Sequence, residues 1–233
     1  MEIEVRDLVR RFYGLRNMAQ IRSETSQRII FVAQHTLAMS RFPRLIQSIK
    51  EYLPETAYRV NPANNNECEA LFLNDADFLL CYETENRRFD FSHRSIRRVE
   101  LENDRLIPVA SARFIEQFDN LDVLFSGNLP LLVYQQGGFL ADVLVNACLP
   151  AVLRDYRIEV ICESAFSAGL REMVLADMGI AWLAHGMIEN QLNDGTLVSL
   201  ESRLGAAELD VVLYFREDSG SDKARAIYDL LDS

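Results

Sequence analysis

The side chains that most often carry chemistry, cysteine and histidine, are few in this chain and far apart. Its four cysteines form no Cys-x-x-Cys pair, and two of them lie in apolar runs, where a reduced thiol acts as a small hydrophobe: Cys68, Cys81, Cys148 and Cys162. The three histidines have no metal-ligand spacing to one another or to the cysteines: His35, His93 and His185. The sequence therefore predicts no metal site, no cofactor and no catalytic residue.

The stretch "LREMVLADMGIAWL", residues 170–183, has the pattern of a helix followed at once by a buried strand. Gly179 occupies the position where a residue of left-handed conformation is expected after the helix. The apolar run after it is typical of a strand covered on both faces. The stretch holds no nucleophile–base pair and no phosphate loop, so we interpret it as scaffold.

Composition narrows the class of protein. Hydrophobic residues make up 49% of the 233 residues and charged residues 25%, which is usual for a globular protein with an ample core. The net charge of −11 makes this chain a poor binder of nucleic acid by itself, and its basic clusters "RNMAQIR" and "HRSIRR" are typical of solvated faces. No apolar run approaches the roughly 20 residues that cross a bilayer, and the N-terminus is charged from its second residue. We expect no membrane contact and a cytoplasmic location.

The first 22 residues repeat apolar side chains at helical-seam spacing: Met1, Val5, Leu8, Phe12, Leu15 and Ala19. This pattern favours a helix that pairs with another helix, or an amphipathic helix packed on its own domain. Because no capping residue precedes it, we expect Met1 to replace an upstream sequence.

From Arg28 onward, strands and helices alternate. Strands are predicted at 28–34, 57–60 and 77–82, separated by one helix that begins at Ser40 and another at 67–73. A second half repeats the order, with strands at 129–135, 156–162 and 179–183, a helix from Gly137 to Leu149 and a helix from Ser164 to Met178. Two βαβαβ units favour an α/β fold with parallel sheets and right-handed crossovers.

We expect the chain to cross between the two lobes more than once. The segment "VELENDRLIPVA" predicts two short strands in series around Asn103–Asp104, and "GTLVSL", residues 195–200, is a plausible return. The predicted limits are then 25–103 with 200–233 for lobe I and 104–199 for lobe II. Ligands of open α/β sheets bind beyond the carboxyl ends of the strands, which predicts a cleft between the lobes.

These segments together resemble the effector-binding domain of LysR-type bacterial transcriptional regulators along the whole chain. The residues that carry the resemblance are "FVAQHTLAMSRFPRLIQSIKEYLPE", "LNDADFLLCY", "LIPVAS" and "MVLADMGIAWLAHGMIENQLNDGTLVSL". In "ADMGIAWLA", Met178 replaces a glycine and Ala184 a proline of the family pattern. The resemblance implies two α/β lobes of the type II periplasmic-binding-protein kind. It also implies dimers or tetramers, and a winged helix-turn-helix head upstream whose linker helix ends within residues 1–22. DNA binding would then belong to that head.

The resemblance also implies which residues contact an effector. They follow the ends of predicted strands, where turn and capping roles are the alternative: Gln34, His35, Thr36, Asn64, Asn65, Tyr134, Gln135, Gly138 and Ser164. Thr36 is the foremost candidate, as a hydroxyl donor to an anion. Ser164 is expected to cap the helix that follows it.

We therefore expect a sensor that binds a small anionic or aromatic effector between its lobes and is not an enzyme. An enzyme would need shifted acid–base groups in the cleft, which offers amides, hydroxyls and one histidine. Two alternatives stay open. One is a solute-binding receptor of the same fold, and the other is oxidant sensing through cysteine or the six methionines.

Overall fold

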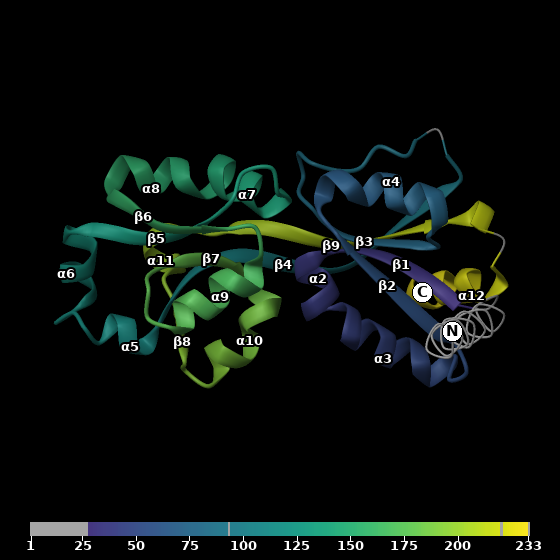
Figure 1. Ribbon diagram of the computed structural model, residues 1–233, viewed down its shortest axis with the longest axis horizontal. Coiled ribbons are helices and arrows are strands. Elements are labelled where there is room, and N and C mark those ends of the chain that lie inside the picture. Colours follow the sequence, from purple (N-terminus) through teal and green to yellow (C-terminus); the bar gives the residue numbers. More distant parts are fainter. Residues whose placement is uncertain (1–27, 93, 220, 233) are drawn as a thin grey trace, which may run out of the picture.

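The computed structural model describes residues 28–92, 94–219 and 221–232, and it arranges them in two halves along the long axis of the molecule (Figure 1). The helix predicted at 1–22 lies outside the described residues. The architecture is the predicted α/β fold of two lobes joined by crossing strands.

The first half is built around β1 (Arg28–Gln34), which pairs in parallel with β2 (Ala57–Ala63) on one side and β3 (Phe78–Glu83) on the other. After β1 come α2 (His35–Ser40) and α3 (Phe42–Tyr52), and α4 (Asn65–Asp75) connects β2 to β3. Pro43 is tolerated because it lies in the first turn of α3, where a backbone N–H would have no helical partner. In Figure 1, α4 covers one face of this sheet and α3 lies on the other.

Two long antiparallel strands, β4 (Ile96–Ser111) and β9 (Ala207–Arg216), run through both halves. In the first half β9 pairs with β3. In the second half β4 pairs with β7 (Ala181–Ala184) and β8 (Leu197–Ser199). The hydrogen-bonded sheet is therefore continuous, in the order β2-β1-β3-β9-β4-β7, with β8 also on β4.

Two expectations about the crossing were wrong. Residues 99–110 belong to one 16-residue strand and not to two, because Asn103 and Asp104 pair with β9 and the register shifts only between Glu100 and Glu102. The side chain of Asn103 donates a hydrogen bond to Asp210 on β9, whereas that of Asp104 is bonded by Tyr82 and Gly186 from other elements. "GTLVSL" does not return to the first half, since β8 pairs with the far end of β4 at Val109–Ser111. The returning strand is β9. The limits proposed for the two lobes stay a prediction.

The second half holds a parallel pair, β5 (Asn128–Tyr134) and β6 (Arg157–Ser164). A parallel bridge between Leu131 and Ile180 sets β5 beside the start of β7. The helices around these strands are α5 (Ala112–Ile115), α6 (Leu121–Ser126), α7 (Phe139–Val143), α8 (Leu149–Asp155), α9 (Ser167–Leu175), α10 (His185–Asn193) and α11 (Glu201–Leu204). A π-helical turn, Leu144–Cys148, joins α7 to α8, and α12 (Asp222–Leu231) returns to the first half.

Gly179 has the expected positive φ, at 151°, but the residue that directly follows the C-cap of α9 in the left-handed conformation is Asp177, at φ 63°. Aspartate tolerates this conformation because its short side chain can hydrogen-bond locally, and here its Oδ1 accepts a hydrogen bond from Ser111 Oγ at 2.5 Å. Gly179 is needed for another reason. At φ 151°, a Cβ on it would lie 2.5 Å from the carbonyl oxygen of Pro130.

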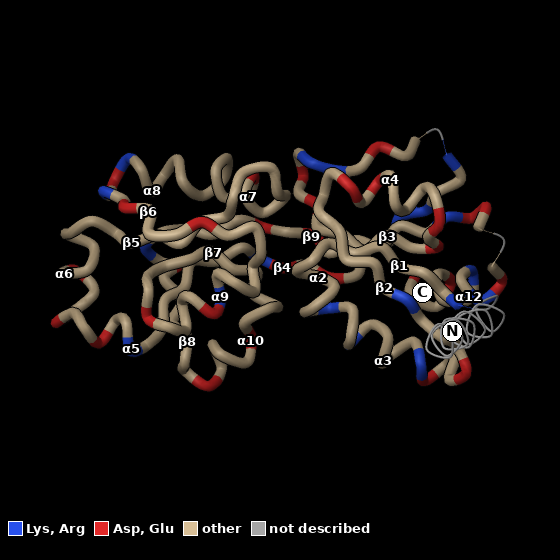
Figure 2. Tube along the Cα trace, in the orientation of Figure 1, with Lys and Arg blue, Asp and Glu red and all other residues tan. Residues whose placement is uncertain are grey.

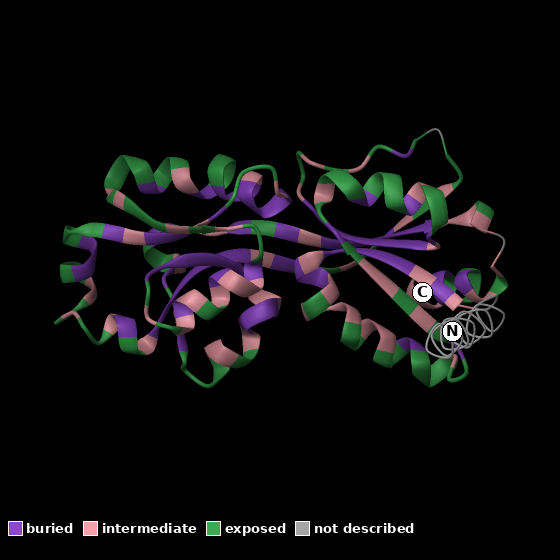
Figure 3. Ribbon diagram, viewed as in Figure 1, coloured by how far each residue is buried: buried purple, intermediate pink, exposed green. Residues whose placement is uncertain are grey.

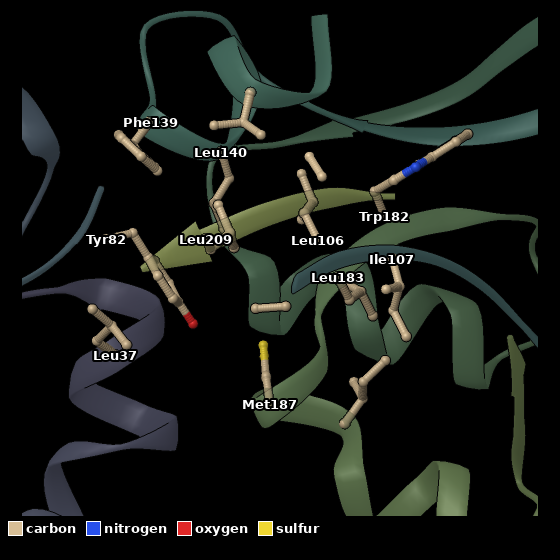
Figure 4. Close-up of a cluster of buried hydrophobic side chains, with 14 of the residues drawn as sticks. Leu37, Tyr82, Leu106, Ile107, Phe139, Leu140, Trp182, Leu183, Met187 and Leu209 are labelled. Atoms are coloured by element: carbon tan, nitrogen blue, oxygen red, sulfur yellow. The ribbon is translucent and has the colours of Figure 1, made fainter. Parts of the chain in front are cut away.

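The core follows the strands and continues from one half into the other (Figure 3). Across the middle, Leu37 and Tyr82 of the first half pack toward Phe139, Leu140 and Met187 of the second (Figure 4). Leu106 and Leu209 lie between them on the crossing strands. A smaller cluster around Phe72 and Phe91 fills the space beneath α4.

Along the described residues, charged residues of both signs are interspersed over the two halves (Figure 2). Among the described residues, no helix combines the length and the apolar character that crossing a membrane requires.

Candidate functional site

A small cavity of about 60 Å³ lies between the two halves, beyond the carboxyl ends of β1 and β5. Its walls come from the beginnings of α2, α4, α7 and α9, the arrangement expected of a ligand site in an open α/β fold. Its lining includes Gln34, His35, Thr36, Asn64, Asn65, Tyr82, Tyr134, Gln135, Gly138, Phe139, Leu140, Ala165 and Ser167.

A hydrogen bond closes the cavity across the two halves. Thr36 Oγ1 on α2 and Ser167 Oγ on α9 are 2.7 Å apart, and both residues are buried. A hydroxyl can donate one hydrogen bond, so this contact consumes the proton of only one of the two groups. The other hydroxyl keeps a proton for a further acceptor.

Gln34, at the end of β1, uses its side-chain amide in hydrogen bonds to neighbouring residues of the cavity wall. Its Oε1 accepts a hydrogen bond from the backbone N–H of Tyr82 at 2.9 Å, and its Nε2 donates to Asn65 Oδ1 at 2.8 Å. The side chain thus joins β1 to β3 and to the first residue of α4. We interpret Gln34 as a positioning residue.

Tyr134 carries the most unusual polar group in the lining. The residue is only 9% exposed, and its hydroxyl has no hydrogen-bond partner of acceptable geometry, although the Ser167 hydroxyl lies beside it. Burial raises the pKa of this phenol, so Tyr134 stays neutral and keeps its proton at physiological pH. A buried donor without an acceptor costs free energy that a bound acceptor would recover.

Eight of the nine predicted contact residues line the cavity: Gln34, His35, Thr36, Asn64, Asn65, Tyr134, Gln135 and Gly138. Ser164 does not. It ends β6, donates a hydrogen bond to Phe166 O and accepts one from Phe166 N, each at 3.1 Å, and therefore holds the turn before α9 instead of capping the helix. Sequence reasoning missed Ser167, the first residue of α9. The only sign of Ser167 in the sequence is that it is a second serine, three residues after Ser164.

Other side-chain contacts also join the two halves. Arg87 pairs with Asp142 and lies over the ring of Phe139. Arg44 on α3 is 3.1 Å from Glu189 on α10. The rings of His35 and Phe166 meet edge to face at 5.3 Å. Because most of these groups are partly exposed, we expect each pair to be worth little alone.

A buried carboxylate, Asp104, ties the crossing strand to both halves. Its Oδ2 accepts a hydrogen bond from Tyr82 OH at 3.0 Å and lies 3.6 Å from the Arg41 guanidinium. Its Oδ1 accepts hydrogen bonds from the backbone N–H groups of Gly186, at 3.0 Å, and Arg105, at 2.8 Å. Tyr82 also lines the cavity, so this carboxylate is one residue away from it.

Burial lowers the reactivity of most of the cysteine thiols. Burial raises the pKa of the Cys68 thiol to about 12 and that of Cys148 to about 11, and it raises the pKa of Cys81 well above its usual value. Cys162 alone among the four is partly exposed. In the part of the chain that the structure describes, no three histidine, cysteine or acidic residues are grouped to hold a metal ion.

We expect one fast-reacting thiol per folded chain. The thiolate is the reactive species, and raised pKa values keep Cys68, Cys81 and Cys148 protonated at pH 8. Titration with a chromogenic disulfide reagent should show one rapid equivalent, lost in Cys162→Ser, and four after denaturation. Two or more rapid equivalents in the native protein would contradict this assignment.

Comparison with known proteins gives one family and several related structures. Residues 22–233 match the LysR substrate binding domain family. The regulatory domain of HypT from Salmonella typhimurium is 20% identical, with a TM-score of 0.73 over 88% of this chain and 94% of that one; the same domain has also been solved with a bromide ion bound.

A variant of the OxyR2 regulatory domain from Vibrio vulnificus is 17% identical, with a TM-score of 0.66 over 88% of this chain and 94% of that one. DarR from Vibrio fischeri, solved in complex with DNA, is 18% identical, with a TM-score of 0.74 over 99% of this chain and 76% of that one. A search of curated proteins finds no match.

Proposed function

The chain belongs to the LysR substrate binding domain family, and on that premise we propose that it senses a small effector in the cavity between its halves. It is a regulatory, effector-binding domain of the LysR type. The proposal that an effector binds in this cavity rests on its lining by Thr36, Tyr134 and Ser167, because buried hydroxyls contributed by both halves converge there. The eight predicted contact residues that line the cavity are proposed on the same basis, and Ser164 is not.

The proposed signal is a change in how the halves are held. Thr36 and Ser167 bond directly across the cavity, so a ligand that bonds to either hydroxyl stabilises or replaces that contact. A ligand can shift the arrangement only by its difference in affinity for the two states. Tyr82 then links the cavity wall to Asp104 on the crossing strand.

No catalytic step is proposed. Among the described residues, the lining has one histidine and no aspartate, glutamate, lysine or arginine, so it lacks the paired acid and base that most hydrolytic and proton-transfer sites use. LysR regulators act on transcription, and we place the chain in the cytoplasm with them. DNA recognition is proposed to lie in a winged helix-turn-helix head, in keeping with the DNA complex of DarR.

We propose that copies of the chain associate into dimers or tetramers through the regulatory lobes. Within the described residues, β2 and β6 each pair with one strand only, and such edges can pair with another chain. Apolar side chains are exposed at the second edge: Val160 and Ile161 on β6 and Leu153 on the adjoining α8. Light scattering of the purified chain checks the assembly.

Oxidant sensing is the alternative. It is favoured by the fold shared with HypT, described as a hypochlorite-specific regulator. In this chain it would depend on Cys162 or on a methionine, because the other thiols are buried. Response to oxidant in a Cys162→Ser variant separates a cysteine mechanism from a methionine one.

We expect Thr36→Val to abolish or greatly reduce effector-induced thermal stabilisation. Valine keeps the shape of threonine but removes the hydroxyl that meets Ser167, and a lost hydrogen bond to a buried polar group costs about 1–3 kcal/mol of binding. The measurement is the thermal midpoint against a library of small acids and neutral metabolites, since stabilisation follows ligand affinity.

The matched control is Thr56→Val. Thr56 is as buried as Thr36 but does not line the cavity. An effector that stabilises Thr36→Val as strongly as the unaltered chain would place its binding site elsewhere and overturn the proposed function.

A further inference from the structure

We infer that the cavity takes a compact monovalent anion and that Tyr134 is the donor that selects it. The inference rests on the proposed function, because it names the ligand class of the same site. It is carried by the buried Tyr134 hydroxyl without a partner, by the uncapped N-terminus of α9, and by the absence of charged side chains among the described residues that line the cavity.

Hydrogen-bond donors exceed acceptors at this wall. The Tyr134 hydroxyl is unpaired, and one proton of the Thr36–Ser167 pair is free. Gln34, by contrast, already uses both its amide oxygen and its amide nitrogen. The groups that remain call for a ligand atom that accepts at least two hydrogen bonds.

The electrostatic environment favours a negative charge. α9 has nine residues, begins at the cavity, and has neither an acidic residue in its first turn nor a side-chain cap, so its first N–H groups and its dipole are uncompensated. No aspartate or glutamate lines the cavity to repel an anion. No lysine or arginine is among the described residues of the lining, so a second negative charge would have no counter-ion inside the cavity itself. Arg87 and Arg88 line an adjoining pocket, and Arg87 is already paired with Asp142.

Volume sets the size of the ligand. The cavity, of about 60 Å³ and open to solvent, holds only a few water-sized atoms without rearrangement. An aromatic acid would need the Thr36–Ser167 contact to open. The closed form therefore fits a monoanion such as a halide or a short carboxylate.

The test compares four probes with the complete chain at constant ionic strength and pH. Acetate represents the class, acetamide is its uncharged isostere, sulfate is a compact dianion, and benzoate is an aromatic monoanion. Backbone NMR shifts of Gly138, Leu140 and Ser167 report binding at the cavity wall. So small a ligand is expected to bind in the millimolar range, and no more tightly than tens of micromolar.

We expect saturable shifts with acetate and at least tenfold weaker binding of the other three. Tyr134→Phe should weaken acetate binding about ten- to hundredfold, because a hydrogen bond to a charged ligand is lost. Its thermal midpoint without ligand should be unchanged or higher, since the hydroxyl removed has no partner. Tyr58→Phe is the matched control: that hydroxyl is also buried and unpaired but does not line the cavity.

If acetamide or sulfate binds as tightly as acetate, the claim that the ligand carries a single negative charge is wrong. If benzoate binds more tightly than acetate, the claim that the ligand is compact is wrong. Absence of saturable acetate shifts would overturn the inference altogether. After any of these results, the proposed function stands if another compound that stabilises the chain shifts the NMR signals of the same backbone amides. The proposed function falls if a compound that stabilises the chain leaves these signals unchanged. Should Tyr134→Phe fail to fold, Ser167→Ala tests the same donor group, and unchanged acetate affinity in that variant would equally count against the inference.

Discussion

Asp104→Ala is expected to lower the free energy of unfolding by about 3–5 kcal/mol. The carboxylate side chain is fully buried and accepts hydrogen bonds from Tyr82 OH and from the N–H groups of Gly186 and Arg105. Its removal leaves the Arg41 guanidinium, itself only 14% exposed, short of one counter-ion. Breaking one side of such a buried pair costs more than the pair contributes, because the remaining polar groups stay desolvated.

Urea denaturation of Asp104→Ala measures the effect, and Glu102→Ala is its control. Glu102 also pairs with Arg41, at 2.9 Å, but its side chain is 42% exposed. Water screens it, so we expect a loss of no more than about 1 kcal/mol. Equal losses in the two variants would show that burial of Asp104 does not determine its contribution.

Asp104 also illustrates what the sequence could and could not predict. Read alone, "LENDRL" places two polar residues inside an apolar pattern, which predicts a break between two strands. The break does not occur because partners from distant segments, Tyr82 and Gly186, satisfy the carboxylate. Such partners are invisible to local pattern, whereas parallel strands such as β1 and β5 are predicted well by their apolar runs.

The position of the cavity could be predicted from the sequence, but its size could not. Strand ends followed by polar turns indicate the residues at the wall, and eight of the nine candidates lie there. The predicted cleft between the lobes is a small cavity, and Leu37, Phe139 and Met187 pack together across the two halves beside it (Figure 4). Its size depends on how closely α2 approaches α9, which a contact between residues 131 positions apart determines.

Gly179→Ala is expected to destabilise the chain by about 3 kcal/mol or more. A φ of 151° is strained for any residue with a side chain, and the added Cβ would lie 2.5 Å from the carbonyl oxygen of Pro130. That oxygen belongs to backbone and cannot move aside cheaply, because it accepts the hydrogen bond from Ile180 N at 2.8 Å. Strain and overpacking therefore add together.

Gly195→Ala separates the two contributions. Gly195 has φ 77°, but a Cβ there would meet nothing within 4 Å, so only the conformational cost of about 1–2 kcal/mol applies. Chemical denaturation compares the variants, and hydrogen exchange at Leu132 and Ile180 shows where Gly179→Ala acts. These residues carry the bonds that join β5 to β7. Because β5 ends at Tyr134, we expect faster hydrogen exchange at Leu132 and Ile180 to accompany weaker ligand binding. Equal stability of Gly179→Ala and Gly195→Ala would mean that the backbone at Pro130 moves to make room for the added methyl group.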